Sequence, residues 1–183
     1  FCVILALKDR TYLPRVDKIF WTFLTFAVVF TLTTVVSISP HTSFWGSLER
    51  MGGLFTFWHY FLFYVVLTSV FRTKAEWLRF LELTVFVGLL SALYGFGQKS
   101  GFGFFVGAGR DRIFGTIGNS ASFAGYQLLT AFLAVVLFFR PQASKKIRIF
   151  LSASFLLLLT ALLMTAVRGA VLGVGVGLFV FEF

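Results

Sequence analysis

Residues 112–139 read RIFGTIGNSASFAGYQLLTAFLAVVLFF, a polar, glycine-containing lead followed by a long apolar run. The run from Ala121 to Phe139 has 19 residues. About 20 mostly apolar residues are needed for a helix that crosses the hydrocarbon core of a bilayer. The stretch therefore predicts a membrane-spanning helix with an arginine, two glycines and an asparagine at its entrance. Polar residues at a membrane edge are costly and often mark a functional site.

The composition of the whole chain agrees with a membrane protein. Of its 183 residues, 58% are hydrophobic and only 13% are charged, and the mean hydropathy is +0.93. A soluble domain carries about 25% charged residues. The net charge of +9 does not indicate nucleic-acid binding, because the basic residues lie between apolar runs rather than on one face. The single cysteine, Cys2, excludes an internal disulfide and a cysteine metal site, and we expect no metal.

The apolar pattern predicts an all-α fold, a polytopic bundle of transmembrane helices in a single domain. Membrane strands would alternate in polarity over about 10 residues, and these runs do not. Because the chain begins with Phe1 and its last run is too short to span, we expect a piece of a longer protein. Five complete spans are expected at residues 19–38, 54–71, 78–96, 121–139 and 149–167, with partial spans at 1–7 and 170–183.

The basic residues between the runs predict the orientation. Eleven Lys and Arg residues fall in the loops at 8–18, 72–79 and 140–148, which the positive-inside rule makes cytoplasmic. Five remain for the outer side, where topology does not call for them. These five are Arg50, Lys99, Arg110, Arg112 and Arg168.

Arg112 and Arg168 are the first candidates for a site, because each stands at the edge of an apolar run on the predicted outer side. A guanidinium offers a planar fork of donors that suits phosphate or pyrophosphate. The alternative interpretation is that both side chains reach lipid headgroups or cap helix ends. Arg50 has the same two interpretations, and the adjacent Glu49 offers it a local ion pair.

Three further features have simpler explanations. Glu82 follows Arg79 by three residues, which predicts an ion pair on one helix face, with a proton relay as the alternative. His59 is expected to be packed and hydrogen-bonded rather than a catalytic base. The four-residue spacing of small residues near the end of the chain permits close helix packing. It is formed by Gly169, Gly173 and Gly177.

Three segments carry a family resemblance. Residues 43–56 read SFWGSLERMGGLFT, residues 112–119 read RIFGTIGN ahead of Ala-Gly-Tyr126, and residues 165–170 read TAVRGA. In this order and spacing they resemble the O-antigen ligase/polymerase superfamily of polytopic membrane proteins. The second segment is the most specific, with Ser120 where the family usually has proline.

The resemblance implies an enzyme, a membrane glycosyltransferase at the outer face of the cytoplasmic (inner) membrane of a bacterium. Its donor would be a glycan linked to undecaprenyl pyrophosphate, and it would need no cofactor. The acceptor, a glycan or a lipid, stays open, as does the choice between ligase, polymerase and protein O-glycosyltransferase. The main alternative is a non-enzymatic polysaccharide flippase or exporter, and a third is a structural subunit that contacts only membrane lipid.

The resemblance also assigns residues. It implies that Arg112 and Arg168, and less directly Arg50, bind the pyrophosphate, and that Asn119 and Tyr126 support them. The catalytic residue is unknown from these residues, because the histidine that the family uses is expected after residue 183.

Overall fold

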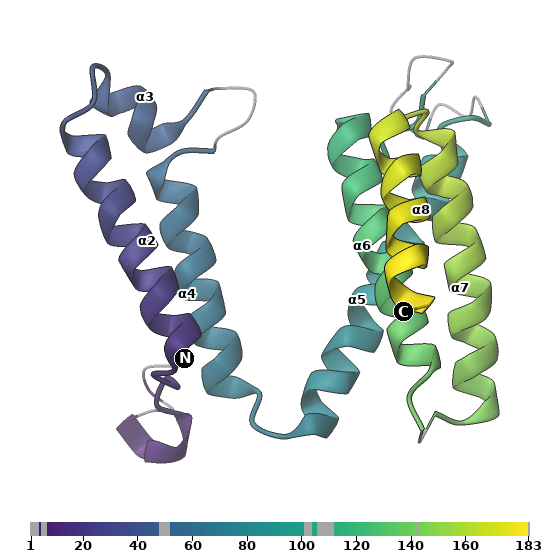
Figure 1. Ribbon diagram of the computed structural model, residues 1–183, viewed down its shortest axis with the longest axis horizontal. Coiled ribbons are helices and arrows are strands. Elements are labelled where there is room, and N and C mark those ends of the chain that lie inside the picture. The colour runs from purple at the N-terminus through teal and green to yellow at the C-terminus, as the bar shows by residue number, and fades with distance from the viewer. Residues whose placement is uncertain are drawn as a thin grey trace. The chain divides into compact units, whose positions relative to one another are not determined.

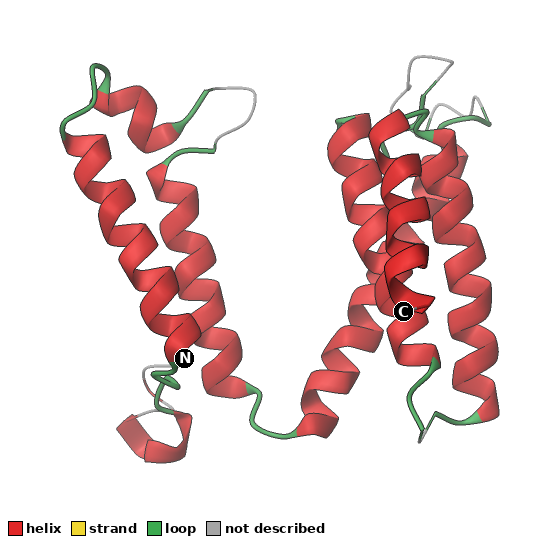
Figure 2. Ribbon diagram, viewed as in Figure 1, coloured by secondary structure: helices red, strands yellow, loops and turns green. Residues whose placement is uncertain are grey.

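The computed structural model describes residue 4 and residues 7–47, 52–100, 104–105, 112–141 and 143–182. All regular structure in these ranges is helical, and no strand occurs in them (Figure 2). The all-α prediction is therefore confirmed for the described ranges. The chain divides into two compact units, Phe1–Glu76 (unit 1) and Trp77–Phe183 (unit 2).

Four helices are long and apolar enough to cross a membrane, which indicates a membrane protein. They are α2 (Lys18–Val35), α5 (Lys74–Gly97), α6 (Ser120–Phe138) and α7 (Lys145–Met164) (Figure 1). Two more helices are apolar but shorter: α4 (Leu54–Val70) and α8 (Arg168–Glu182). Each of these six helices begins or ends, or does both, within three residues of the corresponding bound of its predicted span.

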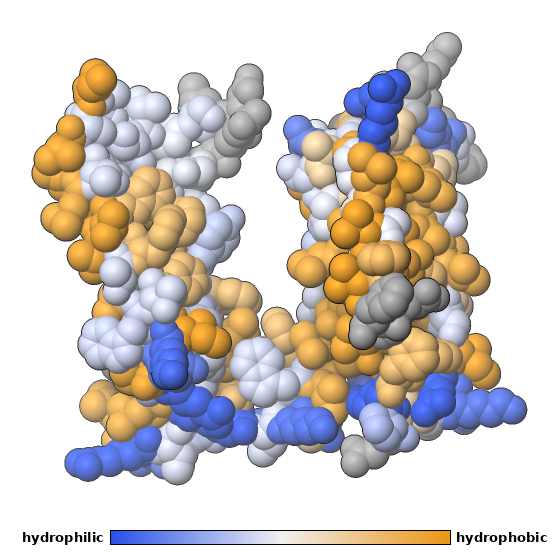
Figure 3. Space-filling model, in the orientation of Figure 1, coloured by the Kyte–Doolittle hydropathy of each residue, from blue (hydrophilic) through white to orange (hydrophobic). Residues whose placement is uncertain are grey.

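The surfaces of these helices are apolar. Large hydrophobic side chains are exposed along them, among them Leu32, Leu129, Leu156 and Leu172. Hydrophobic residues cover the middle of each unit, and the most hydrophilic ones gather at the end of unit 1 where α2 begins and at both ends of unit 2 (Figure 3). Apolar patches of this extent are rare on soluble monomers, whereas lipid solvates them without cost.

Helix α7 differs most from its predicted span of 149–167. It begins at Lys145 because Ser144 caps it, with Oγ accepting from the Ile147 N–H at 3.3 Å. Charged residues can continue a helix beyond the hydrocarbon, so an apolar run marks the span but not the helix start. The helix ends early, at Met164, because Ala166 adopts a left-handed backbone with φ 53°.

Unit 1 is a pair of helices, α2 and α4, joined through α3 (Pro40–Trp45). Aromatic rings fill the α2–α4 contact, with centroids 5.4 Å apart for Phe23–Phe61 and 5.1 Å apart for Phe30–Phe57. Helix α3 is short and begins at Pro40, because proline at the first helical position loses no hydrogen bond.

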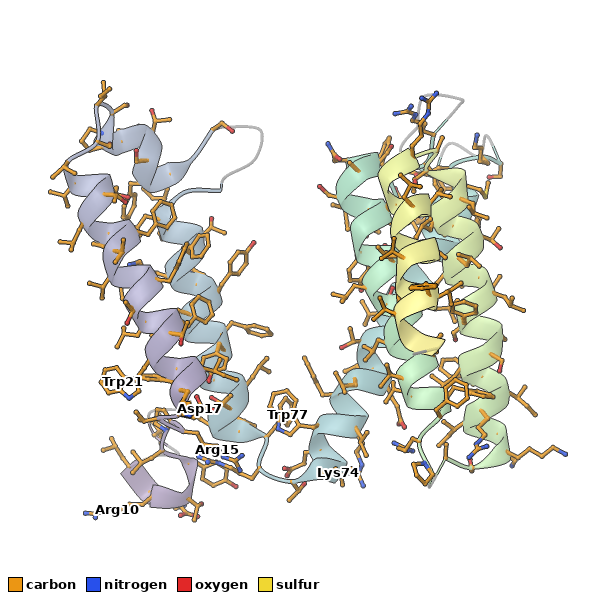
Figure 4. All side chains as sticks on the ribbon, in the orientation of Figure 1. Arg10, Arg15, Asp17, Trp21, Lys74 and Trp77 are labelled. Carbon is orange, nitrogen blue, oxygen red and sulfur yellow. The ribbon has the colours of Figure 1, made fainter. Side chains whose placement is uncertain are left out.

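Polar contacts fasten the end of unit 1 where α2 begins. Arg10, Arg15 and Asp17 lie at this end (Figure 4). The Tyr64 hydroxyl donates to Oδ1 of Asp17 at 3.0 Å, and the Arg15 guanidinium donates to the carbonyl of Arg72 at 3.3 Å. The Asp17 carboxyl caps α2, and the hydrogen bond from the Phe20 N–H lowers its pKa.

In unit 2, α6 packs against both α7 and α8 (Figure 1). The core of this unit combines small and aliphatic side chains of α5, α6 and α7, such as Val85, Ala131 and Leu158, with the larger Phe123 of α6 and with Ile113. Helix α5 comes close to α6 at Gly88, where a Cβ atom would lie 3.1 Å from the side chain of Thr130. Small residues at such crossings let membrane helices approach closely.

The close packing predicted for the glycines of α8 is confirmed at two of the three. A Cβ at Gly173 would lie 3.0 Å from Cδ2 of Leu128, and one at Gly177 would lie 2.6 Å from Cε2 of Phe132. Both neighbours belong to α6. A Cβ at Gly169 would meet nothing within 4 Å.

This difference gives a test with a built-in control. Gly177→Ala should destabilise the α6–α8 contact by about 1–2 kcal/mol, because the Phe132 ring must move to admit the new methyl group. Gly175→Ala adds the same methyl group to the same helix where nothing lies within 4 Å. It should be neutral or slightly stabilising. Denaturation in mixed micelles, followed by circular dichroism, measures both; equal losses would contradict the packing role of Gly177.

Candidate functional site

Unit 2 brings the two predicted arginine segments to one end of its bundle. The backbone N–H of Ile113 donates to the carbonyl of Met164 at 3.4 Å. Arg112 directly precedes Ile113, and Arg168 begins α8 four residues after Met164. Both arginines are exposed. We call this the glycine end of unit 2: α5 and α7 finish there, and α6 and α8 start there.

The loop of residues 112–119 is held from α5 by Gln98. Its Oε1 accepts from the N–H groups of Phe114 at 3.1 Å and Gly115 at 3.0 Å. Its Nε2 donates to the carbonyl of Gly115 at 3.3 Å. Gln98 is only 8% exposed. One carboxamide therefore satisfies three backbone groups of the loop at a place where water has little access.

Two further contacts fix the shape of the loop. The hydroxyls of Ser91 and Thr116 are 2.8 Å apart. This contact ties the loop to α5 about two helical turns before Gln98. Gly115 has φ 57° and lies on the ring of Phe123, the fully buried aromatic side chain near the start of α6. The side chain of Ile113 is also fully buried. The loop is thus anchored to α5, α6 and the end of α7.

The two predicted supporting residues have different positions. Asn119 caps α6: its Oδ1 accepts from the N–H groups of Ala121 at 2.9 Å and Ser122 at 3.1 Å. This structural contact accounts for the asparagine without a ligand. Tyr126 lies within α6 and is partly buried, and its carbonyl accepts from the hydroxyl of Thr130.

The corner of residues 165–168 is compact. Thr165 is fully buried, and its Oγ1 donates to the carbonyl of Leu162 at 2.6 Å and accepts from the N–H of Val167 at 3.4 Å. Ala166 carries the left-handed backbone that turns the chain from α7 into α8.

The exposed guanidinium groups of Arg112 and Arg168 give the glycine end its positive charge. The helix termini add little to it, because α6 and α8 present positive N-termini there while α5 and α7 present negative C-termini. Asn119 also caps the first N–H groups of α6. Arg168 at the first position of α8 is unfavourable for the helix itself, because it puts like charge on the positive end of the dipole. An anion bound beside Arg168 would compensate this charge.

A small groove lies beside the loop. Its volume is about 370 Å³, and it is lined by Tyr94, Phe114, Gly115, Thr116 and Gly118. The groove joins aromatic surface to backbone and hydroxyl groups. Sequence reasoning did not single out Gln98 or Ser91, because their partners are distant in the sequence and no local pattern connects them.

The remaining predicted residues fall elsewhere. Arg50 and Arg110 lie outside the described residues. The predicted ion pair of Glu82 with Arg79 is wrong: Oε1 of Glu82 pairs with Arg140 at 2.9 Å. Arg140 follows the end of α6 by two residues and reaches Glu82 on α5, and a sequence-local rule cannot anticipate this partner.

His59 is hydrogen-bonded as predicted, with Nδ1 2.8 Å from the carbonyl of Phe55. Its ring centroid lies 4.2 Å from that of Phe55, although the side chain is exposed. Among the described residues, no group of three or more His, Cys, Asp or Glu side chains is placed to hold a metal ion. No family model, curated protein or solved structure matches the chain.

Proposed function

We propose that the chain belongs to a membrane glycosyltransferase of the O-antigen ligase/polymerase type. It would transfer or polymerise a glycan carried on undecaprenyl pyrophosphate at the outer face of a bacterial inner membrane. In this proposal α4 is the fifth complete span, and the loops at 8–18, 72–79 and 140–148 are cytoplasmic.

The observation that supports this proposal best is the backbone hydrogen bond between Ile113 and Met164. It joins two segments that carry exposed arginines and that resemble family elements in sequence. A lipid-linked pyrophosphate fits these features, because its isoprenyl chain stays in the bilayer while its phosphates reach the membrane edge.

The proposed chemistry is a displacement at the anomeric carbon of the donor sugar. The acceptor hydroxyl forms the new C–O bond and gives its proton to a general base. The bond between the sugar and the pyrophosphate breaks, and the lipid pyrophosphate leaves with the electron pair. Arg112 and Arg168 would stabilise the negative charge that develops on the leaving group. The proposal assigns no general base to the described residues.

Charge removal at the two arginines tests the proposal. Arg112→Ala and Arg168→Ala should each weaken binding of a polyprenyl pyrophosphate by about 10–100-fold, since a charge-assisted hydrogen bond contributes about 1.5–3 kcal/mol. Lys99→Ala removes the same charge near the end of α5 and should change the affinity little. Binding is measured with the full chain in detergent micelles, a readout that needs no general base.

Three results would count against the proposal. Unchanged donor binding in both arginine variants would remove their assigned role. Equal losses of affinity in all three variants would show that binding depends on the net charge of the chain and not on these two arginines. Movement of a labelled lipid-linked glycan across vesicle membranes without any new glycosidic bond would favour the flippase or exporter.

A further inference from the structure

We infer that Gln98 is the positioning residue of this site: it sets the spacing between Arg112 and the corner that carries Arg168. The part of the inference that concerns ligand binding rests on the proposed function. The part that concerns the position of the loop rests only on the contacts of Gln98. Gln98 does not belong to any segment that carries the family resemblance.

Gln98 pairs with the backbone of Gly115. It accepts from the N–H of this residue and donates to its carbonyl, as a neighbouring strand would do. The same Oε1 also accepts from Phe114. Gln98 is nearly buried, so these backbone groups have no equivalent partner in water if the carboxamide is lost.

The residues that Gln98 pairs with directly follow Arg112 and Ile113 in the loop. Gln98 holds residues 114 and 115, and the N–H of Ile113, directly before them, bonds to Met164. Arg112 therefore leaves the loop at a point held on one side by α5 and on the other by the end of α7. Movement of residues 114–115 would shift Ile113 and, with it, the backbone from which Arg112 extends.

The loop has other anchors besides Gln98. The hydrophobic anchors Ile113 and Phe123 are fully buried, and the Ser91–Thr116 bond provides a separate tie. These contacts keep the loop attached when Gln98 is changed. Loss of the carboxamide should therefore loosen the backbone at 114–115 more than it unfolds the unit.

A distance measurement tests the positioning directly. Spin labels are attached at residues 112 and 168 of the full chain, as Arg112→Cys and Arg168→Cys in a Cys2→Ser background. With Gln98 present the distance distribution should be narrow. With Gln98→Met, which keeps the length but loses the hydrogen bonds, it should broaden or shift, roughly twofold in width, because local backbone order is lost. An unchanged distribution would overturn the inference.

Ligand binding supplies the second readout, with farnesyl pyrophosphate as the probe and Arg112 and Arg168 intact. Gln98→Met should weaken binding about tenfold, because a small misplacement of binding groups is costly. Gln98→Glu should bind poorly at neutral pH, where its second oxygen faces the carbonyl of Gly115. It should recover as the pH falls and the neutral acid donates to that carbonyl, whereas the unsubstituted chain should not gain affinity over the same range.

Controls separate positioning from stability and from charge. Glu82→Gln loosens the opposite end of the same unit. This variant should bind farnesyl pyrophosphate normally even where it loses as much thermal stability as Gln98→Met. If Gln98→Met binds normally and only Gln98→Glu fails, the effect is charge repulsion and the inference is wrong. If the unsubstituted chain does not bind the probe, the proposed function fails, and the spin-label distances still decide the role of Gln98.

Discussion

Gly115→Ala is expected to destabilise unit 2 by about 2–4 kcal/mol, the sum of an unfavourable left-handed backbone and overpacking of the core. A Cβ at Gly115 would overlap Cε2 of Phe123 and lie 2.7 Å from its Cδ2. Phe123 is fully buried and cannot swing aside into solvent. The loss should appear as an earlier transition in mixed-micelle denaturation and as weaker binding of a polyprenyl pyrophosphate.

Gly118→Ala is the matched control. Its φ of 80° carries the same kind of backbone penalty, but no atom lies within 4 Å of its Cβ position. The control should therefore lose only about 1 kcal/mol, the conformational part of the effect. If the two variants lose equal stability, the contact between Gly115 and Phe123 contributes nothing.

The second large effect is expected at the opposite end of unit 2, where Glu82 meets Arg140. The two side chains are 30% and 17% exposed. Glu82→Met should cost about 2–4 kcal/mol, somewhat less than for a fully buried pair, because it leaves the arginine without its counter-charge. Arg140→Met should cost a similar amount for the converse reason.

A double-mutant cycle measures this pair. The combined variant Glu82→Met/Arg140→Met should recover much of the stability lost in either single variant, because it leaves no uncompensated charge. Additive losses would show that the two side chains do not interact. The Arg148 guanidinium, 5.8 Å from the ring centroid of Phe138, is close enough to α6 to require a separate Arg148→Met control.

Hydrophobicity alone predicted most of the helices, because a bilayer requires long apolar segments and internally paired backbones. Helix ends were less predictable, since they depend on side chains outside the apolar runs. Helix α5 begins at Lys74 rather than at residue 78. Its start is a capping box: Oε2 of Glu76 accepts from the N–H of Thr73 at 2.8 Å, and the Thr73 hydroxyl accepts from the Glu76 N–H at 3.3 Å. The spacing of Thr73 and Glu76 carries this signal in the sequence itself.

The candidate site was predictable only in part. Arg112 and Arg168 could be predicted because their charges stand at the edges of apolar runs. The residue that holds the loop could not be found in this way. Gln98 is an ordinary polar residue just beyond an apolar run, and its partners at 114 and 115 become neighbours only when the chain folds back. Contacts of this kind are properties of the tertiary fold.

The bond between Ile113 and Met164 also has a consequence for biogenesis. A membrane protein is synthesised and inserted in chain order, so the loop at 112–119 emerges well before its partner at the end of α7. Until α7 has been inserted, the N–H of Ile113 lacks this acceptor and the loop is held from α5 and α6 alone. The glycine end is therefore completed late, after α7 has been inserted. A nascent chain that stops before Met164 would carry Arg112 on a loop that lacks this hydrogen bond.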